Sequence, residues 1–236
     1  MNIPVSKLDK FSNRVSRHDE FKKETTNVPK VFSYPPPRTM LVGMHNTILT
    51  DEFIHKRRLD KHNLILNSVC YGIPSAKEFA NRMVFPIRRN HSPHIIGAVA
   101  RSMAPYSKAR YIIKPEQLNV SELLFRSNPI PIESNLPVLR IVEGPIDCFI
   151  LRQGTLALLG SSMSSTQAGV IRELSPKRLT IALDRDAYNK SVKFTYDFFF
   201  ASNIKVKVLK LPEKKDPADL GLREIIRIES ETESIS

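Results

Sequence analysis

Six carboxylate side chains follow apolar runs in the second half of this sequence, close to where each run ends. They are Glu143, Asp147, Asp184, Asp186, Asp216 and Asp219. Carboxylates that converge without cysteine or histidine suit a hard cation such as Mg²⁺ or Mn²⁺. One residue separates Asp184 from Asp186, so in an extended segment both side chains point the same way. The alternative is structural, because Glu143 could be an exposed acid at a strand end, and Asp184 and Asp186 could cap the following helix.

The elements around these acids alternate between buried strands and helices. Strands are predicted over 138–142, 155–159, 179–183 and 204–211, and helices over 145–152, 165–174 and 187–201. This alternation predicts an α/β domain with a mostly parallel sheet and helices on both faces. The carboxyl ends of parallel strands share the sheet edge where ligands bind, so the six acids should meet there. Alternating lysines in the last strand indicate a position near a sheet edge.

The region upstream predicts a small α+β unit. Thr50 is expected to cap a helix that runs through Arg58, a second helix should reach about Asn67, and strands are predicted over 84–87, 95–99 and 111–113. Residues 1–40 carry apolar side chains at helical spacing among basic ones and then three prolines, which predicts a basic arm and a stiff linker. The predicted organisation is an arm (1–40), an α+β subdomain (41–137), the α/β domain (138–222) and a polar C-terminal tail (223–236).

Positive charge is concentrated in the first two-thirds of the chain. The formal net charge is +12, of which residues 1–40 contribute +4, residues 41–137 contribute +6 and residues 138–236 contribute +2. Such a distribution suits a polyanion such as nucleic acid. A basic surface that serves only solubility has the same composition, so charge alone does not choose between the two.

The composition argues against a membrane protein, a secreted protein and a thiolate zinc site. The apolar runs are too short to span a bilayer, and the polar N-terminus lacks the apolar core of a signal peptide, so a cytoplasmic protein is expected. Cys70 and Cys148 each lie in an apolar stretch, which predicts two buried free thiols. No CxxC pair is present, so no zinc site of paired thiolates is expected.

The motifs that contain the acids resemble those of a known family. Residues 141–147 (Ile-Val-Glu-Gly-Pro-Ile-Asp), followed by Asp184-Arg185-Asp186, are similar to the signature of the TOPRIM fold, which primases, topoisomerases and some nucleases share. Residues 215–220 (Lys-Asp-Pro-Ala-Asp-Leu) resemble the KDPD-type motif of bacterial and phage DnaG-like DNA primases. Residues 158–164, with Gln167, resemble the primase motif after the second strand of that domain.

The upstream region carries further similarity to primases. Residues 81–88 (Asn-Arg-Met-Val-Phe-Pro-Ile-Arg) resemble the primase strand that contains Phe-Pro-Ile-Arg. Residues 110–116 resemble a second primase motif, and residues 51–73 resemble the entry to the primase core. The resemblance covers about residues 50–222.

The resemblance implies a DNA primase catalytic core: a Rossmann-like TOPRIM domain that, with Mg²⁺ or Mn²⁺, joins ribonucleotides into short RNA primers on single-stranded DNA. It implies that Glu143, Asp184 and Asp186 are catalytic and hold the metal, with Glu143 a candidate proton acceptor. Asp147, Asp216 and Asp219 would support the metal or position lysines. Phosphates and template backbone would be held by Arg82, Arg88, Arg101, Arg110, Lys114 and Lys215.

The implied partners are single-stranded DNA, nucleoside triphosphates, a replicative helicase and a separate protein that supplies the zinc module of complete primases, in the cytoplasm of a bacterium or of a phage-infected host. Two other functions stay open. A nuclease of the same metal fold would share the carboxylates but not the Phe-Pro-Ile-Arg strand. A primase-derived module without activity would bind single strands or a replication partner.

Overall fold

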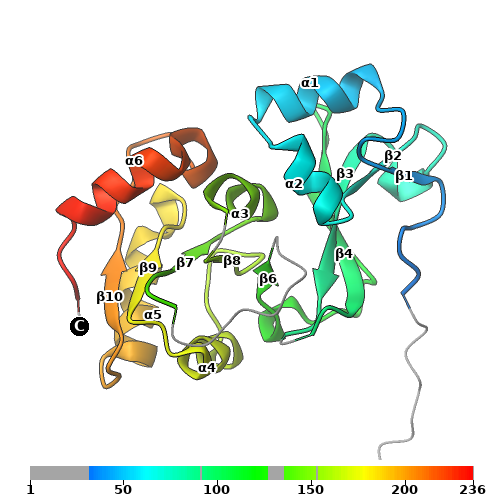
Figure 1. Cartoon of the computed structure of the whole chain (residues 1–236). Coiled ribbons are helices and arrows are strands. Elements are labelled where there is room, and N and C mark those ends of the chain that lie inside the picture. The colour runs from blue at the N-terminus through cyan, green and yellow to red at the C-terminus, as the bar shows by residue number, and fades with distance from the viewer. Residues whose placement is uncertain (1–31, 91, 127–135, 153, 236) are drawn as a thin grey trace, which may run out of the picture. The chain divides into compact units, whose positions relative to one another are not determined.

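A computed structural model describes residues 32–235, apart from 91, 127–135 and 153. Residues 1–31 of the predicted basic arm lie outside the described residues. The described part contains two five-stranded sheets with helices packed against them (Figure 1). This confirms the predicted mixed α/β fold. None of the described helices is long and apolar enough to cross a membrane.

The first sheet is antiparallel throughout, in the order β1-β2-β3-β4-β5. Its strands are β1 (Thr39–Leu41), β2 (Cys70–Gly72), β3 (Arg82–Arg88), β4 (Ile95–Ser102) and β5 (Tyr111–Lys114). Helices α1 (Ile48–Lys56) and α2 (Lys61–Leu66) connect β1 to β2. The sequence predicted both helices and β3 to β5, but it missed the two three-residue strands.

The N-cap of α1 is Thr47, and the prediction of Thr50 was wrong. The Thr47 hydroxyl accepts a hydrogen bond from the Thr50 N–H at 3.2 Å, and Thr50 itself is fully buried. Asp51 lies in the first turn with either cap. The acidic pattern that favours a helix N-terminus therefore did not distinguish the two threonines.

The second sheet has the order β10-β9-β7-β8-β6. Its strands are β6 (Phe125–Arg126), β7 (Leu139–Val142), β8 (Thr155–Ala157), β9 (Arg178–Ile181) and β10 (Lys205–Val208). The pairs β10/β9, β9/β7 and β7/β8 are parallel, and β6 pairs with β8 in the antiparallel sense. The strand with alternating lysines, β10, lies at the edge as predicted. Because β6 precedes residue 137 yet belongs to this sheet, the predicted division at 137/138 does not separate the sheets.

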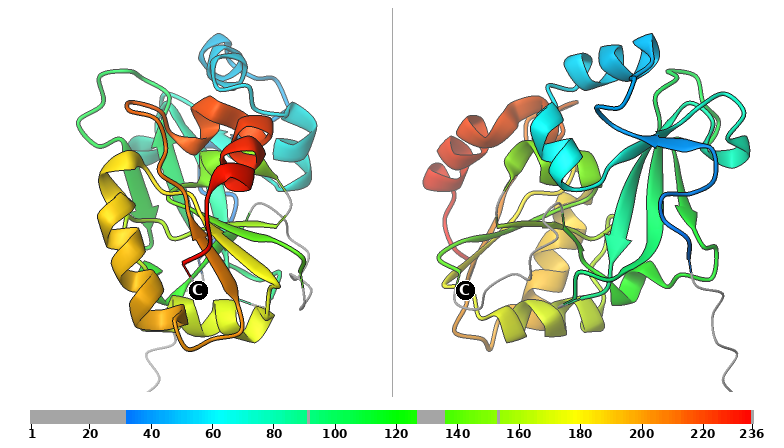
Figure 2. Two further views of the ribbon diagram at one scale, coloured as in Figure 1. Left: turned by 90° about the vertical axis from the view of Figure 1, so that its left-hand side faces the viewer. Right: turned by 45° about the vertical axis from the view of Figure 1, so that its right-hand side comes forward.

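Helices cover both faces of the second sheet (Figure 2). Helices α3 (Pro145–Leu151) and α6 (Pro217–Glu231) share one hydrophobic cluster with Val142, Ala182 and Leu209. Helices α4 (Ser165–Leu174) and α5 (Tyr188–Phe199) pack on the opposite face, where the cluster includes Ile141 and Ile181. The two predicted free thiols are confirmed, since both cysteines are buried and unpaired.

The C-terminal tail predicted over 223–236 is largely helical, and that prediction was wrong. Helix α6 runs to Glu231, and Gly221 interrupts it with φ of 75°, a value that glycine adopts readily. Its Glu229 side chain is buried and forms a 2.9 Å ion pair with Arg140 of β7. Thr180 of β9 also donates to the Glu229 carboxylate. These polar contacts of Glu229 add to the apolar contacts that Ile225 of α6 makes in the cluster shared with α3.

Candidate metal centre

Three carboxylates meet at the carboxyl edge of the second sheet. Glu143 directly follows β7, while Asp184 and Asp186 follow the neighbouring parallel strand β9. Each offers one oxygen atom, and these three atoms lie within 4.8 Å of one another. The predicted convergence of these three acids is therefore observed, and its cause is the parallel pairing of β7 with β9, which ends both strands side by side.

Hydrogen bonds fix the loop after β9 against its neighbours. The Asp184 N–H donates to Glu143 Oε1 at 3.2 Å. The Arg185 guanidinium donates to the carbonyl oxygen of Leu211 at 2.9 Å, which ties the same loop to the segment after β10. Asp184 and Asp186 thus project from a loop anchored on both sides. We call the carboxylates of Glu143, Asp184 and Asp186 the acidic triad.

Nearby cations compensate the negative charge of the acidic triad only in part. Burial, and then the charge of Asp184, raise the pKa of Glu143 to about 7. Burial and the charges of Asp216 and Asp186 raise the pKa of Asp184, against the opposing effect of Arg110. In the part of the chain that the structure describes, no salt bridge reaches these three acids. Three oxygen donors under mutual repulsion are a fitting donor set for a hard divalent cation.

Asp147 lies beside the acidic triad and faces backbone donors. Only 8% of its surface is exposed. Its Oδ2 accepts the Gly144 N–H at 3.2 Å, and its Oδ1 accepts the Ala218 N–H at 3.1 Å. Burial, and then the charge of Asp216, raise its pKa to about 7. Asp147 therefore links the turn after β7 to the first turn of α6.

Asp216 and Asp219 cap α6. Asp216 is the N-cap, and its Oδ1 accepts the Asp219 N–H at 2.7 Å. Asp219 Oδ2 lies 3.5 Å from the Asp216 N–H in the reciprocal contact. Both side chains also line the cavity beside the acidic triad. Asp216 and Asp219 therefore form a capping box at the start of α6 and also lie at the site.

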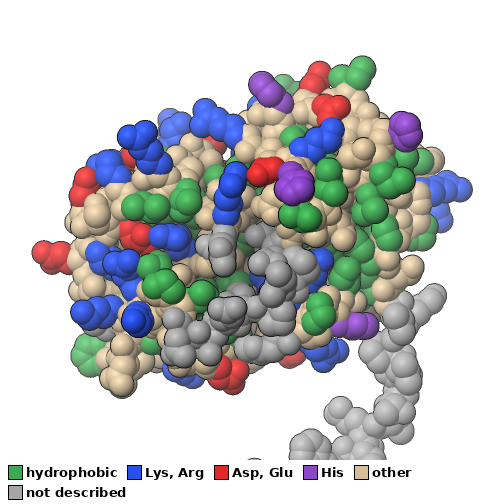
Figure 3. Space-filling model, viewed as in Figure 1, with side chains coloured by type: hydrophobic (Ala, Val, Ile, Leu, Met, Phe, Trp, Pro, Cys, Tyr) green, Lys and Arg blue, Asp and Glu red, His purple; other side chains and the backbone are tan. Residues whose placement is uncertain are grey.

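Cations from distant parts of the sequence surround the triad. A cavity of 790 Å³ is lined by Lys56, Arg57, Arg110, Asp184, Arg185, Asp186, Glu213, Lys214, Lys215, Asp216 and Asp219. A second cavity of 300 Å³ reaches Glu143, Tyr111 and Asp147, and it shares Arg57 and Arg110 with the first. Arg57 Nη1 lies 3.9 Å from Asp216 Oδ2. Lys and Arg side chains also crowd the surface over α6 and β10 (Figure 3).

The six predicted basic residues divide between this site and the first sheet. Arg110 and Lys215 line the larger cavity. Arg101 lies with its guanidinium carbon 4.7 Å from the ring centre of Tyr111, which lines the smaller one.

The other three make their contacts within the first part of the chain. Arg82 donates to the carbonyl oxygens of Glu78 and Ala109. Arg88 is buried and donates to the Asn67 carbonyl oxygen, and Lys114 pairs with Glu78 and Glu116. The structure therefore does not bring Arg82, Arg88 and Lys114 into the lining of either cavity.

Sequence reasoning missed Lys56 and Arg57. They end α1, more than eighty residues before the acidic triad, and only the folded chain brings them to the cavity. The basic run His55–Arg58 at the end of a predicted helix was the one local signal.

Comparisons with known proteins rest on the fold. No protein-family model and no curated protein matches the sequence. The structure of the Aquifex aeolicus primase, with its zinc-binding and RNA polymerase domains, matches at a TM-score of 0.64 and 20% identity, over 80% of this chain and 57% of that chain. The DnaG primase catalytic domain bound to ssDNA matches at a TM-score of 0.63 and 16% identity, over 79% of this chain and 72% of that chain. The RNA polymerase domain of Mycobacterium tuberculosis DnaG matches at a TM-score of 0.58 and 17% identity, over 77% of this chain and 74% of that chain.

The fold and the site define an α/β protein with an acidic centre at the carboxyl edge of a sheet and a cationic cavity beside it. The described residues have the fold of a DnaG-type primase catalytic core. At identities of 16–20% the likeness concerns the fold, and the chain spans little more than half of the Aquifex chain.

Proposed function

We propose that this chain is the catalytic core of a DNA primase and joins ribonucleotides into short RNA primers on single-stranded DNA. The observation that carries the proposal is the acidic triad, whose oxygen atoms lie within 4.8 Å of one another beside a cavity lined by lysines and arginines. The fold of DnaG primase cores supports it, as does the crystallised complex of one such domain with ssDNA. We assign the second sheet and its helices to the TOPRIM family on the motifs around these acids.

The acidic triad fits Mg²⁺, because all of its donors are carboxylate oxygens and no salt bridge pairs them with a basic side chain among the described residues. We assign the metal to Glu143, Asp184 and Asp186. When bound, the metal supplies positive charge that neutralises the phosphates and aligns the reacting oxygens.

The chain's own cations would hold the polyphosphate. Arg57, Arg110 and Lys215 line the cavity next to the triad, where guanidinium and ammonium groups bind phosphate oxygens. Glu143 is the candidate proton acceptor, because one of its oxygens is free of the hydrogen bond from Asp184. Asp147 acts as a positioning residue through its backbone contacts, and Asp216 and Asp219 act at the rim of the cavity.

The proposal extends to partners. Primer synthesis requires a single-stranded DNA template and nucleoside triphosphates. We assign template contacts to Arg82, Arg88, Arg101 and Lys114 together with the first sheet, and we expect a replicative helicase and a protein with a zinc module to assist.

The test is an incubation of purified protein with single-stranded DNA, labelled nucleoside triphosphates and Mg²⁺. New oligoribonucleotides would support the proposal, shortened DNA would indicate a nuclease of the same fold, and neither product would indicate a binding module. Glu143→Gln and Asp184→Asn should each lower synthesis by at least about a hundredfold. Glu52→Gln is the matched control, because this exposed acid on α1 lines neither cavity.

A further inference from the structure

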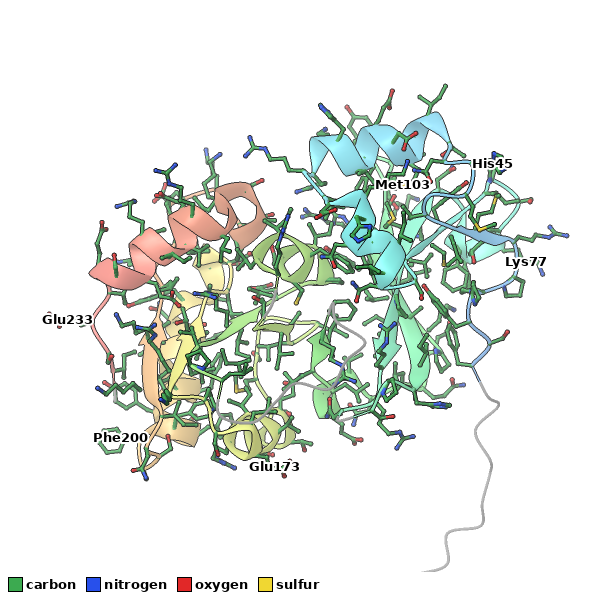
Figure 4. All side chains as sticks on the ribbon, in the orientation of Figure 1. His45, Lys77, Met103, Glu173, Phe200 and Glu233 are labelled. Atoms are coloured by element: carbon green, nitrogen blue, oxygen red, sulfur yellow. The ribbon has the colours of Figure 1, made fainter. Side chains whose placement is uncertain are left out.

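The exposed face of α5 carries two lysines followed by two aromatic side chains. Lys190, Lys193, Tyr196 and Phe200, the C-cap residue, are spaced by three, three and four residues, so they share one side of the helix. Tyr196 is 51% exposed and Phe200 is 66% exposed. Their ring centres lie 5.8 Å apart and the rings are tilted by 39°. Figure 4 labels Phe200, whose ring extends away from the ribbon at the end of α5.

The fold itself does not require these two rings. Helix α5 already packs against the second sheet through Phe194 and Phe199, which belong to the buried cluster on that face. Two adjacent aromatic rings in solvent expose apolar surface at a free-energy cost, and such exposed groups mark binding sites.

This face leads away from the metal centre. Helix α5 begins two residues after Asp186, and Lys190 is close enough to the acidic triad for its charge to act on Glu143. Lys210 Nζ lies 5.7 Å from the ring centre of Tyr188, which adds a further cation at the start of the helix. A rise of 1.5 Å per residue places Phe200 about 15 Å along the helix from Lys190. That length accommodates about four stacked nucleotides at about 3.4 Å each.

We propose that this face of α5 binds a single strand of nucleic acid that runs to or from the metal centre. Lys190 and Lys193 contact its phosphates, and Tyr196 and Phe200 stack against its bases. The combination of cations with stacked aromatic rings matches the chemistry of a charged backbone that carries flat bases. The one acid exposed on this face of α5, Asp197, lies four residues after Lys193, so the two lysines outnumber it along the path of the strand. The inference rests on the proposed function only for the role of this strand as template or primer.

The test measures equilibrium binding of the full-length protein to three labelled 20-mers: dT20, rU20 and an abasic deoxyribose 20-mer. Metal and nucleotides are omitted, so the result does not depend on catalysis. The double variant Tyr196→Ala/Phe200→Ala should bind dT20 or rU20 at least about fivefold more weakly than wild type, because neither ring remains for a base to stack on. Its affinity for the abasic strand should stay unchanged. The preference between dT20 and rU20 distinguishes a template from a primer.

Lysine variants supply an independent signature. Lys190→Gln/Lys193→Gln should lower the slope of log K against log salt by about 0.7 for each phosphate that these lysines neutralise in wild type. The double aromatic variant should keep the wild-type slope. Tyr106→Ala is the control for removal of an exposed ring, because Tyr106 is 95% exposed and lines neither cavity. It should bind all three strands as wild type does.

A double variant Tyr196→Leu/Phe200→Leu keeps apolar surface without aromatic rings, and its melting curve checks that the fold persists. If it binds dT20 and rU20 as tightly as wild type, stacking is absent and the inference is wrong. Equal binding by the alanine variant also contradicts it and leaves a protein partner as the occupant of this face. Neither result measures primer synthesis, so neither one contradicts the proposed function.

Discussion

Asp147 should make the stability of the metal-free protein depend on pH in an unusual direction. The side chain is buried and its pKa in the folded protein is about 7, whereas an unfolded aspartate titrates near 4. Because the folded state binds the proton more tightly, stability is fully present below about pH 4 and is lost as the pH rises through 7. Three units of difference correspond to a loss of about 4 kcal/mol at pH 8.

Asp147→Asn removes this loss of stability at high pH, but it also removes one hydrogen bond. The amide has one acceptor oxygen, whereas the Asp147 carboxyl accepts from both Gly144 N–H and Ala218 N–H. One buried backbone donor then lacks an acceptor, at a cost of about 1–3 kcal/mol at every pH. The variant should therefore be less stable than wild type at pH 5. By pH 8 the difference should move toward the variant by about 2.5 kcal/mol, because part of the loss in wild type has already occurred at pH 5, and this brings the two close together or reverses their order.

The assay is urea unfolding in EDTA at pH 5 and pH 8 for wild type, Asp147→Asn and the exposed-acid control Glu52→Gln. The control should follow wild type at both pH values. If the free-energy difference between Asp147→Asn and wild type is the same at pH 5 and pH 8, Asp147 titrates as an ordinary aspartate and the argument from burial is refuted.

Three further predictions concern the triad, the cavity and the buried ion pair. Added Mg²⁺ should raise the melting temperature of wild type in a concentration-dependent manner, and Asp184→Asn should lose most of this rise; an equal rise in the variant would place the metal elsewhere. Arg57→Gln should raise KM for nucleoside triphosphates about tenfold with a smaller change in kcat, measured in the primer assay, because one cation no longer binds the phosphates. Glu229→Ala should destabilise the protein by about 3–5 kcal/mol in urea unfolding, because it leaves Arg140 buried without its partner; a loss below about 1 kcal/mol would contradict this.

The sequence predicted the acidic triad because the pattern that identifies it lies within short stretches of the chain. Glu143, Asp184 and Asp186 each follow a buried strand, and parallel strands end at one edge, so strand order did not need to be known. The strands and helices of the second sheet were predictable for the same reason, since their apolar periodicity stands out along the chain.

The rest depends on contacts between distant segments. Arg57 reaches the cavity only because α1 ends there, and no local pattern encodes that position. Asp147 faces the backbone N–H of Ala218, a partner that exists only once α6 has docked. Helix α6 was missed although Leu222, Ile225 and Ile228 recur at helical spacing, and β6 was missed because two residues give no periodicity.

The central claim is that Glu143, Asp184 and Asp186 together bind a divalent cation. Titration with Mn²⁺, followed by the loss of the free-ion signal in electron paramagnetic resonance, measures this directly and does not require catalysis. Wild type should take up Mn²⁺ in competition with Mg²⁺, Asp184→Asn and Glu143→Gln should bind at least about tenfold more weakly, and Glu52→Gln should bind as wild type does. Wild type that leaves the Mn²⁺ signal unchanged, or an Asp184→Asn variant that binds as tightly as wild type, would contradict the claim.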